Sequence, residues 1–203
     1  MDGTLLDSLE AQIESYRRAI LECGGRDRSY GEILDSFALG PAANMLAVLI
    51  DRPVGDEAVT RYEAHLREAA THVRPYARVT IALRELSTRF RLGVFTAADT
   101  NAADILLEGT GLRPFFGVVV GADRVARTKP APDGLLMACE ALGARPEEAV
   151  YVGDGPSDMA VARACGALGI AAGWGHQFAV DREADAVAET PDELVRLLID
   201  GAA

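Results

Sequence analysis

Long apolar runs are missing from this sequence. No segment approaches the ~18 consecutive apolar residues that a membrane-spanning helix needs, so we expect no membrane partner. The first residues carry no basic stretch followed by an apolar one, so we expect no signal peptide. Cysteine is scarce, and the three thiols at positions 23, 139 and 165 form no C-x-x-C pair. This usage is typical of reduced thiols in a cytoplasmic protein rather than of a disulfide framework.

Basic residues are also in deficit. The 203 residues contain 20 Lys and Arg against 31 Asp and Glu, which gives a formal net charge of −11. This balance disfavours nucleic acid as a partner, because phosphate backbones are bound by positive faces. It does not exclude a small phosphorylated substrate, since one local cation can override the global field. The length and the 49% hydrophobic content predict one folded domain, or one domain with an inserted module.

The two parts of the chain differ in their hydrophobic period. Up to about residue 72, apolar residues recur at helical spacing in three runs separated by glycine and proline turns, with no strand pattern. From about residue 75, short apolar runs at 92–95, 117–120, 149–152 and 168–172 alternate with helical segments. Such alternation indicates βαβ units and a buried parallel sheet. We therefore predict an α/β protein with a helical module joined near its start.

Polar residues fall where the predicted strands end, and ligands of open parallel sheets bind at that edge. The segment D-G-T-L-L-D-S opens at Asp2, Thr96 ends the run at 92–95, and Lys129 precedes a helix. Asp154 and Asp158 follow the run at 149–152. Each feature is weak alone, because D-G-T is usually a turn, a strand-end Thr a helix cap and a single Lys a surface charge. Together, in this order, they are much more specific.

These four segments resemble the four motifs of the haloacid dehalogenase superfamily, in the branch of phosphoglycolate phosphatase-like enzymes. The resemblance covers nearly the whole chain. It implies a Rossmann-like parallel sheet core formed by residues 1–6 and 76–203, with an inserted helical cap formed by residues 7–75. The activity that it implies is Mg²⁺-dependent hydrolysis of a small phosphorylated metabolite through an aspartyl-phosphate.

The resemblance also implies a metal site and an acid–base residue. Asp154 would bind Mg²⁺ directly, Asp158 would hold the inner sphere in place, and the backbone carbonyl of Asp2 would be a further ligand. Hard oxygen ligands of this kind suit Mg²⁺. The side chain of Asp2 would protonate the leaving alcohol and then accept a proton from water.

The remaining implied roles concern the phosphoryl group. Lys129 would neutralise the phosphoryl oxygens and the attacking carboxylate. Thr96 would donate a hydrogen bond to a phosphoryl oxygen, with the amide of Ala97 beside it. The tight turn at Gly40 and Pro41, between two helices of the cap, could reach the site and help to select the substrate.

The first Asp of the family motif D-x-D-G-T, its nucleophile, falls one position before Met1 in this register. The apolar strand that leads into it, which the family places at the centre of the sheet, falls there too. We therefore expect a start codon upstream, and negligible activity without those residues. Asp2 as the nucleophile is disfavoured, because the acid–base position would then fall at Thr4.

Two alternatives stay open: a catalytically silent relative that binds a phosphorylated ligand or a partner, and a sugar-phosphate mutase of the same fold. Thr4 argues mildly against the mutase, because mutase-like relatives tend to have Val there. The sequence leaves the substrate and the oligomeric state open.

Overall fold

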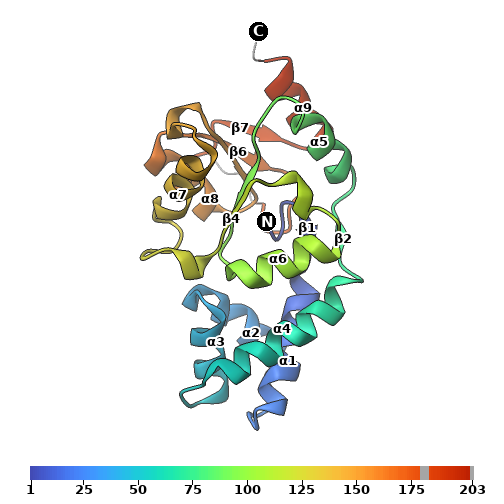
Figure 1. The fold of residues 1–203 in the computed structure, drawn as a ribbon, viewed down its shortest axis with the longest axis vertical. Helices are drawn as coiled ribbons and strands as arrows, with labels where there is room; N and C mark the ends of the chain where they lie inside the picture. The colour runs from blue at the N-terminus through green and yellow to red at the C-terminus, as the bar shows by residue number, and fades with distance from the viewer. Residues whose placement is uncertain (179–182, 202–203) are drawn as a thin grey trace.

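Four helices from the first third of the chain gather at one end of the molecule, at the bottom of Figure 1. The computed structural model describes residues 1–178 and 183–201. We call these helices the helical module: α1 (Leu9–Glu22), α2 (Tyr30–Ser36), α3 (Ala42–Ile50) and α4 (Asp56–Ala70). Three of them match the predicted helical runs. The sequence pattern misses α2, because this short helix buries only one large apolar side chain, Ile33, and begins with a capping box between Ser29 and Glu32.

Two short antiparallel strands bracket the helical module. β1 (Leu6–Asp7) pairs with β2 (Arg74–Pro75), so the chain enters and leaves the module side by side. Neither strand was predicted, because two residues are too few to show an alternating pattern.

The rest of the chain forms an α/β body with parallel strands, which confirms the predicted fold class. The strands are β3 (Gly93–Phe95), β4 (Val118–Val120), β5 (Val150–Gly153), β6 (Leu168–Ala172) and β7 (Ala186–Ala188). The helices are α5 (Val79–Leu86), α6 (Thr100–Gly109), α7 (Asp133–Leu142), α8 (Pro156–Cys165) and α9 (Pro191–Ile199). Short 3-10 turns lie at Phe37–Leu39, Arg113–Phe115, Ala122–Arg124 and Pro146–Glu148. Each predicted apolar run overlaps one of these strands, whereas β7 was not predicted.

Helices cover both faces of the parallel strands. Tyr151 of β5 packs in the apolar cluster with α7 and α8, and the next residue, Val152, packs in the cluster with α5 and α9. This is the alternation expected of a strand that is buried on both faces, and it explains why the strands read as continuous apolar runs.

The parallel strands form two separate groups. Among the residues that the structure describes, β3 pairs only with β4, and β5 pairs only with β6. A cavity of about 420 Å³ is lined by residues of both β3 and β5, with Val94, Val152, Leu83 and Leu135 among its apolar walls. An open space thus separates the two groups of parallel strands.

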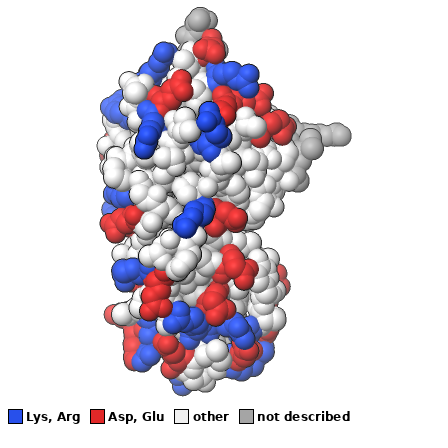
Figure 2. Space-filling model, turned by 90° about the vertical axis from the view of Figure 1, so that its right-hand side faces the viewer, with Lys and Arg blue, Asp and Glu red and all other residues white. Residues whose placement is uncertain are grey.

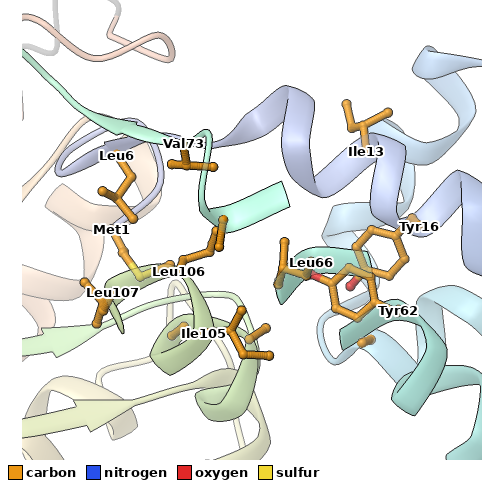
Figure 3. Packing of buried hydrophobic residues seen from close by; sticks show 14 of the residues in the cluster. Met1, Leu6, Ile13, Tyr16, Tyr62, Leu66, Val73, Ile105, Leu106 and Leu107 are labelled. Atoms are coloured by element: carbon orange, nitrogen blue, oxygen red, sulfur yellow. The ribbon is translucent and has the colours of Figure 1, made fainter. Parts of the chain in front are cut away.

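An apolar cluster joins the helical module to the α/β body (Figure 3). Within the module, Tyr16 and Tyr62 stack with their ring centroids 3.9 Å apart. The helix α4 packs on α6 through Leu66, Ile105 and Leu106. Leu66 and Leu106 are fully buried, and burial of one such side chain stabilises a protein by roughly 1.5–3 kcal/mol. The module is therefore held in a defined position against the body.

The face of the molecule in Figure 2 mixes Lys and Arg with Asp and Glu along its whole length. Many of the charged side chains on the surface are paired, as in the exposed ion pairs Arg17–Asp27 and Arg61–Glu57. Within the described ranges, no helix combines the length and the apolar character that crossing a membrane requires.

Candidate active site

The residues that the motifs single out line one cavity of about 460 Å³ between the helical module and the α/β body. Thr96 follows β3 and Asp154 follows β5, and parallel strands bring such positions to the same edge of a sheet. The cavity walls contain every predicted site residue: Asp2, Gly40, Thr96, Ala97, Lys129, Asp154 and Asp158.

Lys129, the only lysine of the chain, forms a buried ion pair with Asp158. The Nζ–Oδ1 distance is 2.7 Å, and the two side chains are 12% and 11% exposed. The Tyr151 hydroxyl lies 3.2 Å from the same Oδ1, and the Gly155 N–H donates to Oδ2 at 3.1 Å. Burial alone would lower the pKa of Lys129, but Tyr151 and Asp158 raise it above its usual value. The ammonium therefore keeps its charge inside the cavity wall.

Asp154 is held by the first residues of the chain and by the loop after β6, and it is 6% exposed. The Thr4 hydroxyl donates to its Oδ1 at 3.0 Å, and the Gln177 N–H donates to its Oδ2 at 3.1 Å. The Trp174 indole N–H donates to the Thr4 carbonyl at 2.8 Å, which ties the two segments together. Gly3 has φ +75°, and a Cβ there would overlap the Asp154 carboxylate. The glycine of D-G-T is therefore required by a close approach as well as by its backbone conformation.

The carboxylate of Asp2 is positioned by the helical module. Its Oδ1 accepts hydrogen bonds from the Ser8 hydroxyl and from Nε2 of Gln12, the latter at 2.7 Å. Ser8 and Gln12 are both buried. They lie one helical turn apart at the start of α1, so their side chains share a face. The module thus sets the orientation of the side chain that the resemblance assigns to proton transfer.

Thr96 is buried at the end of β3. Its N–H donates to the Val120 carbonyl at 3.0 Å, which extends the pairing of β3 with β4. Its Oγ1 accepts from the Ala98 N–H at 3.2 Å. A hydroxyl that accepts this bond still has its own proton to donate.

The structure adds cavity residues that the sequence analysis did not identify: Leu9, Gln12, Tyr16, Phe37, Met45, Asp99, His176 and Gln177. The His176 ring lies 4.0 Å from Oδ2 of Asp154 and 3.3 Å from the Tyr76 hydroxyl. Its position after the carboxyl end of β6 is a signal that could have identified it. The module residues have no such signal, because the side of a helix that faces the cavity depends on how the module docks.

The carboxylates of Asp154 and Asp158 fit a hard divalent cation. Both are buried and line the cavity, and Lys129 is the only Lys or Arg among the described residues in its walls. The described residues hold no cluster of three or more His, Cys, Asp or Glu side chains suited to a metal. Mg²⁺ does not need one, since one or two carboxylates commonly hold it while waters complete its shell. The Asp2 carbonyl would supply a further oxygen.

The chain is similar to known proteins along nearly its whole length. The profile of haloacid dehalogenase-like hydrolases matches residues 1–172. Phosphoglycolate phosphatase of Chromobacterium violaceum is 31% identical over 217 aligned positions, covering 99% of this chain and 95% of that protein. Pyrophosphatase PpaX of Bacillus pumilus is 31% identical over 176 positions, covering 86% of this chain and 81% of that protein. The crystal structure of a HAD phosphatase from Thermococcus onnurineus matches with a TM-score of 0.76 at 26% identity, covering 98% of this chain and 95% of that one.

Proposed function

The chain belongs to the haloacid dehalogenase-like hydrolase family, and from that premise we propose that it is a Mg²⁺-dependent phosphomonoester hydrolase of a small metabolite. The observation that carries the proposal is the cavity itself. The cavity is lined by a charged lysine, a strand-end threonine and the motif aspartates Asp2, Asp154 and Asp158, which come from four separate segments of the chain. Catalysis of phosphoryl transfer depends mainly on such positioning and charge neutralisation. We also propose a cytoplasmic location, because three cysteines without a C-x-x-C pair are typical of reduced thiols in a cytoplasmic protein.

Each residue takes a part in the proposed reaction. Asp154, Asp158 and the Asp2 carbonyl would hold Mg²⁺, which when bound neutralises charge on the phosphoryl oxygens. Lys129 contacts the same oxygens, and the Thr96 hydroxyl donates a hydrogen bond to one of them. The Asp that the family motif D-x-D-G-T puts directly before Met1 would attack the phosphorus, and the Asp2 carboxyl gives its proton to the leaving alcohol oxygen as the P–O bond to the alcohol breaks. Water then attacks the phosphorus of the resulting aspartyl-phosphate, and Asp2 takes a proton from that water as the bond to the aspartate breaks and phosphate leaves.

The helical module, residues 7–75, serves in this proposal as a cap over a core of residues 1–6 and 76–203. Gly40 supports the assignment, since it lines the cavity from the module side, and a Cβ there would lie 3.7 Å from the Thr128 side chain, next to Lys129. Ser8 and Gln12 support it as well, because they link the module to Asp2. The cap would then select the alcohol and orient the proton donor together.

The test compares three chains: residues 1–203, the same chain preceded by a short apolar strand ending in Asp directly before Met1, and that extended chain with Asn in place of the added Asp. The assay is Mg²⁺-dependent release of phosphate from an aryl phosphate. We expect turnover only from the chain with the added Asp, and a melting temperature raised in both extended chains, because the added strand fills the gap between β3 and β5.

Equal activity of the 203-residue chain would mean that Asp2 is the nucleophile and that the motif register is wrong. An extended chain that is stable but inert on a broad panel of phosphomonoesters would favour a silent relative that only binds its ligand. Transfer of phosphate between hydroxyls of a sugar phosphate, without release, would favour the mutase.

A further inference from the structure

The walls of the cavity are chemically unequal. The α/β body contributes the charged and hydroxyl groups of the proposed phosphate site, whereas the helical module contributes apolar surface from Leu9, Tyr16, Phe37 and Met45. The one lysine is already paired with a carboxylate. His176, the other basic side chain in the described walls, lies against Asp154. The part of a substrate beyond its phosphate therefore meets a surface with little positive charge.

Asp99, which lines the cavity from the α/β body, has an unusual set of hydrogen bonds. It occupies the N-cap position of α6, yet its side chain makes no capping hydrogen bond there. Instead, Oδ2 accepts a hydrogen bond from the Ala42 N–H at the first residue of α3, at 2.9 Å. Oδ1 is buried and has no hydrogen-bond partner among the described residues. Burial raises the pKa of Asp99, and the nearby charges of Asp123 and Glu63 raise it as well. The hydrogen bond from the Ala42 N–H lowers this pKa, but the net shift is upward.

Two consequences follow for a ligand. The N-terminus of α3, where free N–H groups would suit a substrate carboxylate, is already occupied by the Asp99 carboxylate. The unpaired Oδ1 is an acceptor whose desolvation no described residue offsets, and a donor on a ligand in the cavity that Asp99 lines would offset it. A second carboxylate placed beside the ionised Asp99 would meet a like charge, and Lys129, the one Lys or Arg in the described walls, is already paired with Asp158.

We infer that the substrate is a phosphomonoester whose alcohol carries a hydroxyl or ammonium donor for Asp99 and carries no carboxylate. The inference rests on the proposed function and makes it more specific. It also separates this chain from the relative in Chromobacterium violaceum, whose name specifies phosphoglycolate, an ester with a carboxylate at the far end.

Binding of four phosphate esters of similar length tests the inference without requiring turnover. Phosphoglycolate ends in a carboxylate, 2-hydroxyethyl phosphate in a hydroxyl, phosphoethanolamine in an ammonium and ethyl phosphate in a methyl group. Each is titrated calorimetrically into the 203-residue chain with Mg²⁺. We expect 2-hydroxyethyl phosphate and phosphoethanolamine to bind about tenfold or more tightly than phosphoglycolate, with ethyl phosphate between them.

Asp99→Asn assigns the effect to one side chain. Asn keeps an oxygen for the Ala42 N–H but removes the negative charge, so the advantage of phosphoethanolamine over ethyl phosphate should fall toward onefold and phosphoglycolate should gain affinity. Ethyl phosphate should bind unchanged. Asp192→Asn, which alters an exposed carboxylate paired with Arg78, is the matched control and should leave the order as it is.

Phosphoglycolate binding as tightly as the hydroxyl and ammonium esters, with ethyl phosphate still bound, would overturn the inference and leave the proposed function standing. An unchanged order in Asp99→Asn would overturn the assignment to Asp99. Failure of all four esters and of inorganic phosphate to bind would remove the phosphate site, and the inference would fall together with the proposed function.

Discussion

Replacing Lys129 with Met should destabilise the protein by about 3 kcal/mol in the absence of Mg²⁺. Removing one member of a buried ion pair typically costs about 3–5 kcal/mol, because the other charge stays buried without its partner. The lower end applies here, since Asp158 keeps its contacts with Tyr151 and the Gly155 N–H. Met fills most of the space of the lysine stem, so little of the cost comes from a cavity.

Urea denaturation in EDTA measures this cost, with Arg78→Met as the control. Arg78 pairs with Asp192 on the surface, and loss of such an exposed pair costs at most about 1 kcal/mol. Asp158→Asn and the double variant complete a thermodynamic cycle. The double variant should lose at least ~1 kcal/mol less than the sum of the two single variants, because it leaves neither charge unpaired.

Two further conditions sharpen the result. Mg²⁺ should reduce the loss of unfolding free energy in Lys129→Met, since a cation near Asp158 replaces the missing charge. Acidification should reduce it as well. Burial raises the pKa of Asp158, but the Lys129 charge, the N-terminal ammonium and the hydrogen bonds from Lys129 and the Gly155 N–H together lower it below its usual value. The pair therefore stabilises the fold above the usual Asp pKa of about 3.9 and loses this effect as the pH falls below it. A loss under ~1 kcal/mol, or strictly additive variants, would refute the reasoning.

Two other predictions concern the neighbouring residues. Gly3→Ala should lower the free energy of unfolding by well over ~1 kcal/mol, because it adds a clash with Asp154 to the strain of a positive φ. The control is Gly24→Ala, where φ is +74° and the space around the glycine is open, so only the backbone strain applies. Thermal melting should show a loss of about 1 kcal/mol for this control. Mg²⁺ at about 100 times its Kd should stabilise the wild-type chain by roughly 2.7 kcal/mol and the Asp154→Asn variant far less. The control variant Asp192→Asn should be stabilised as much as the wild type. Equal stabilisation of all three chains would mean that the metal binds elsewhere.

Local pattern was sufficient for the main alternation of strands and helices and for the identity of the motif residues, although it missed α2 and the strands β1, β2 and β7. Short apolar runs ended at Thr96 and before Asp154, and the carboxyl ends of parallel strands necessarily meet at one edge. The sequence alone therefore predicts that the motif residues lie together.

Only the tertiary structure decided which side chains of the helical module meet the site. Asp99 and Ala42 lie 57 positions apart and are joined by one hydrogen bond, and Gln12 reaches Asp2 from another element. Helical periodicity tells which residues share a face, but not which other element that face will contact. That choice depends on how the module packs against α6, through side chains such as Leu66 and Leu106, whose partners are distant in sequence. The motif residues can thus be recognised in the local sequence, whereas the cavity wall that the helical module contributes forms only when the module docks against the α/β body.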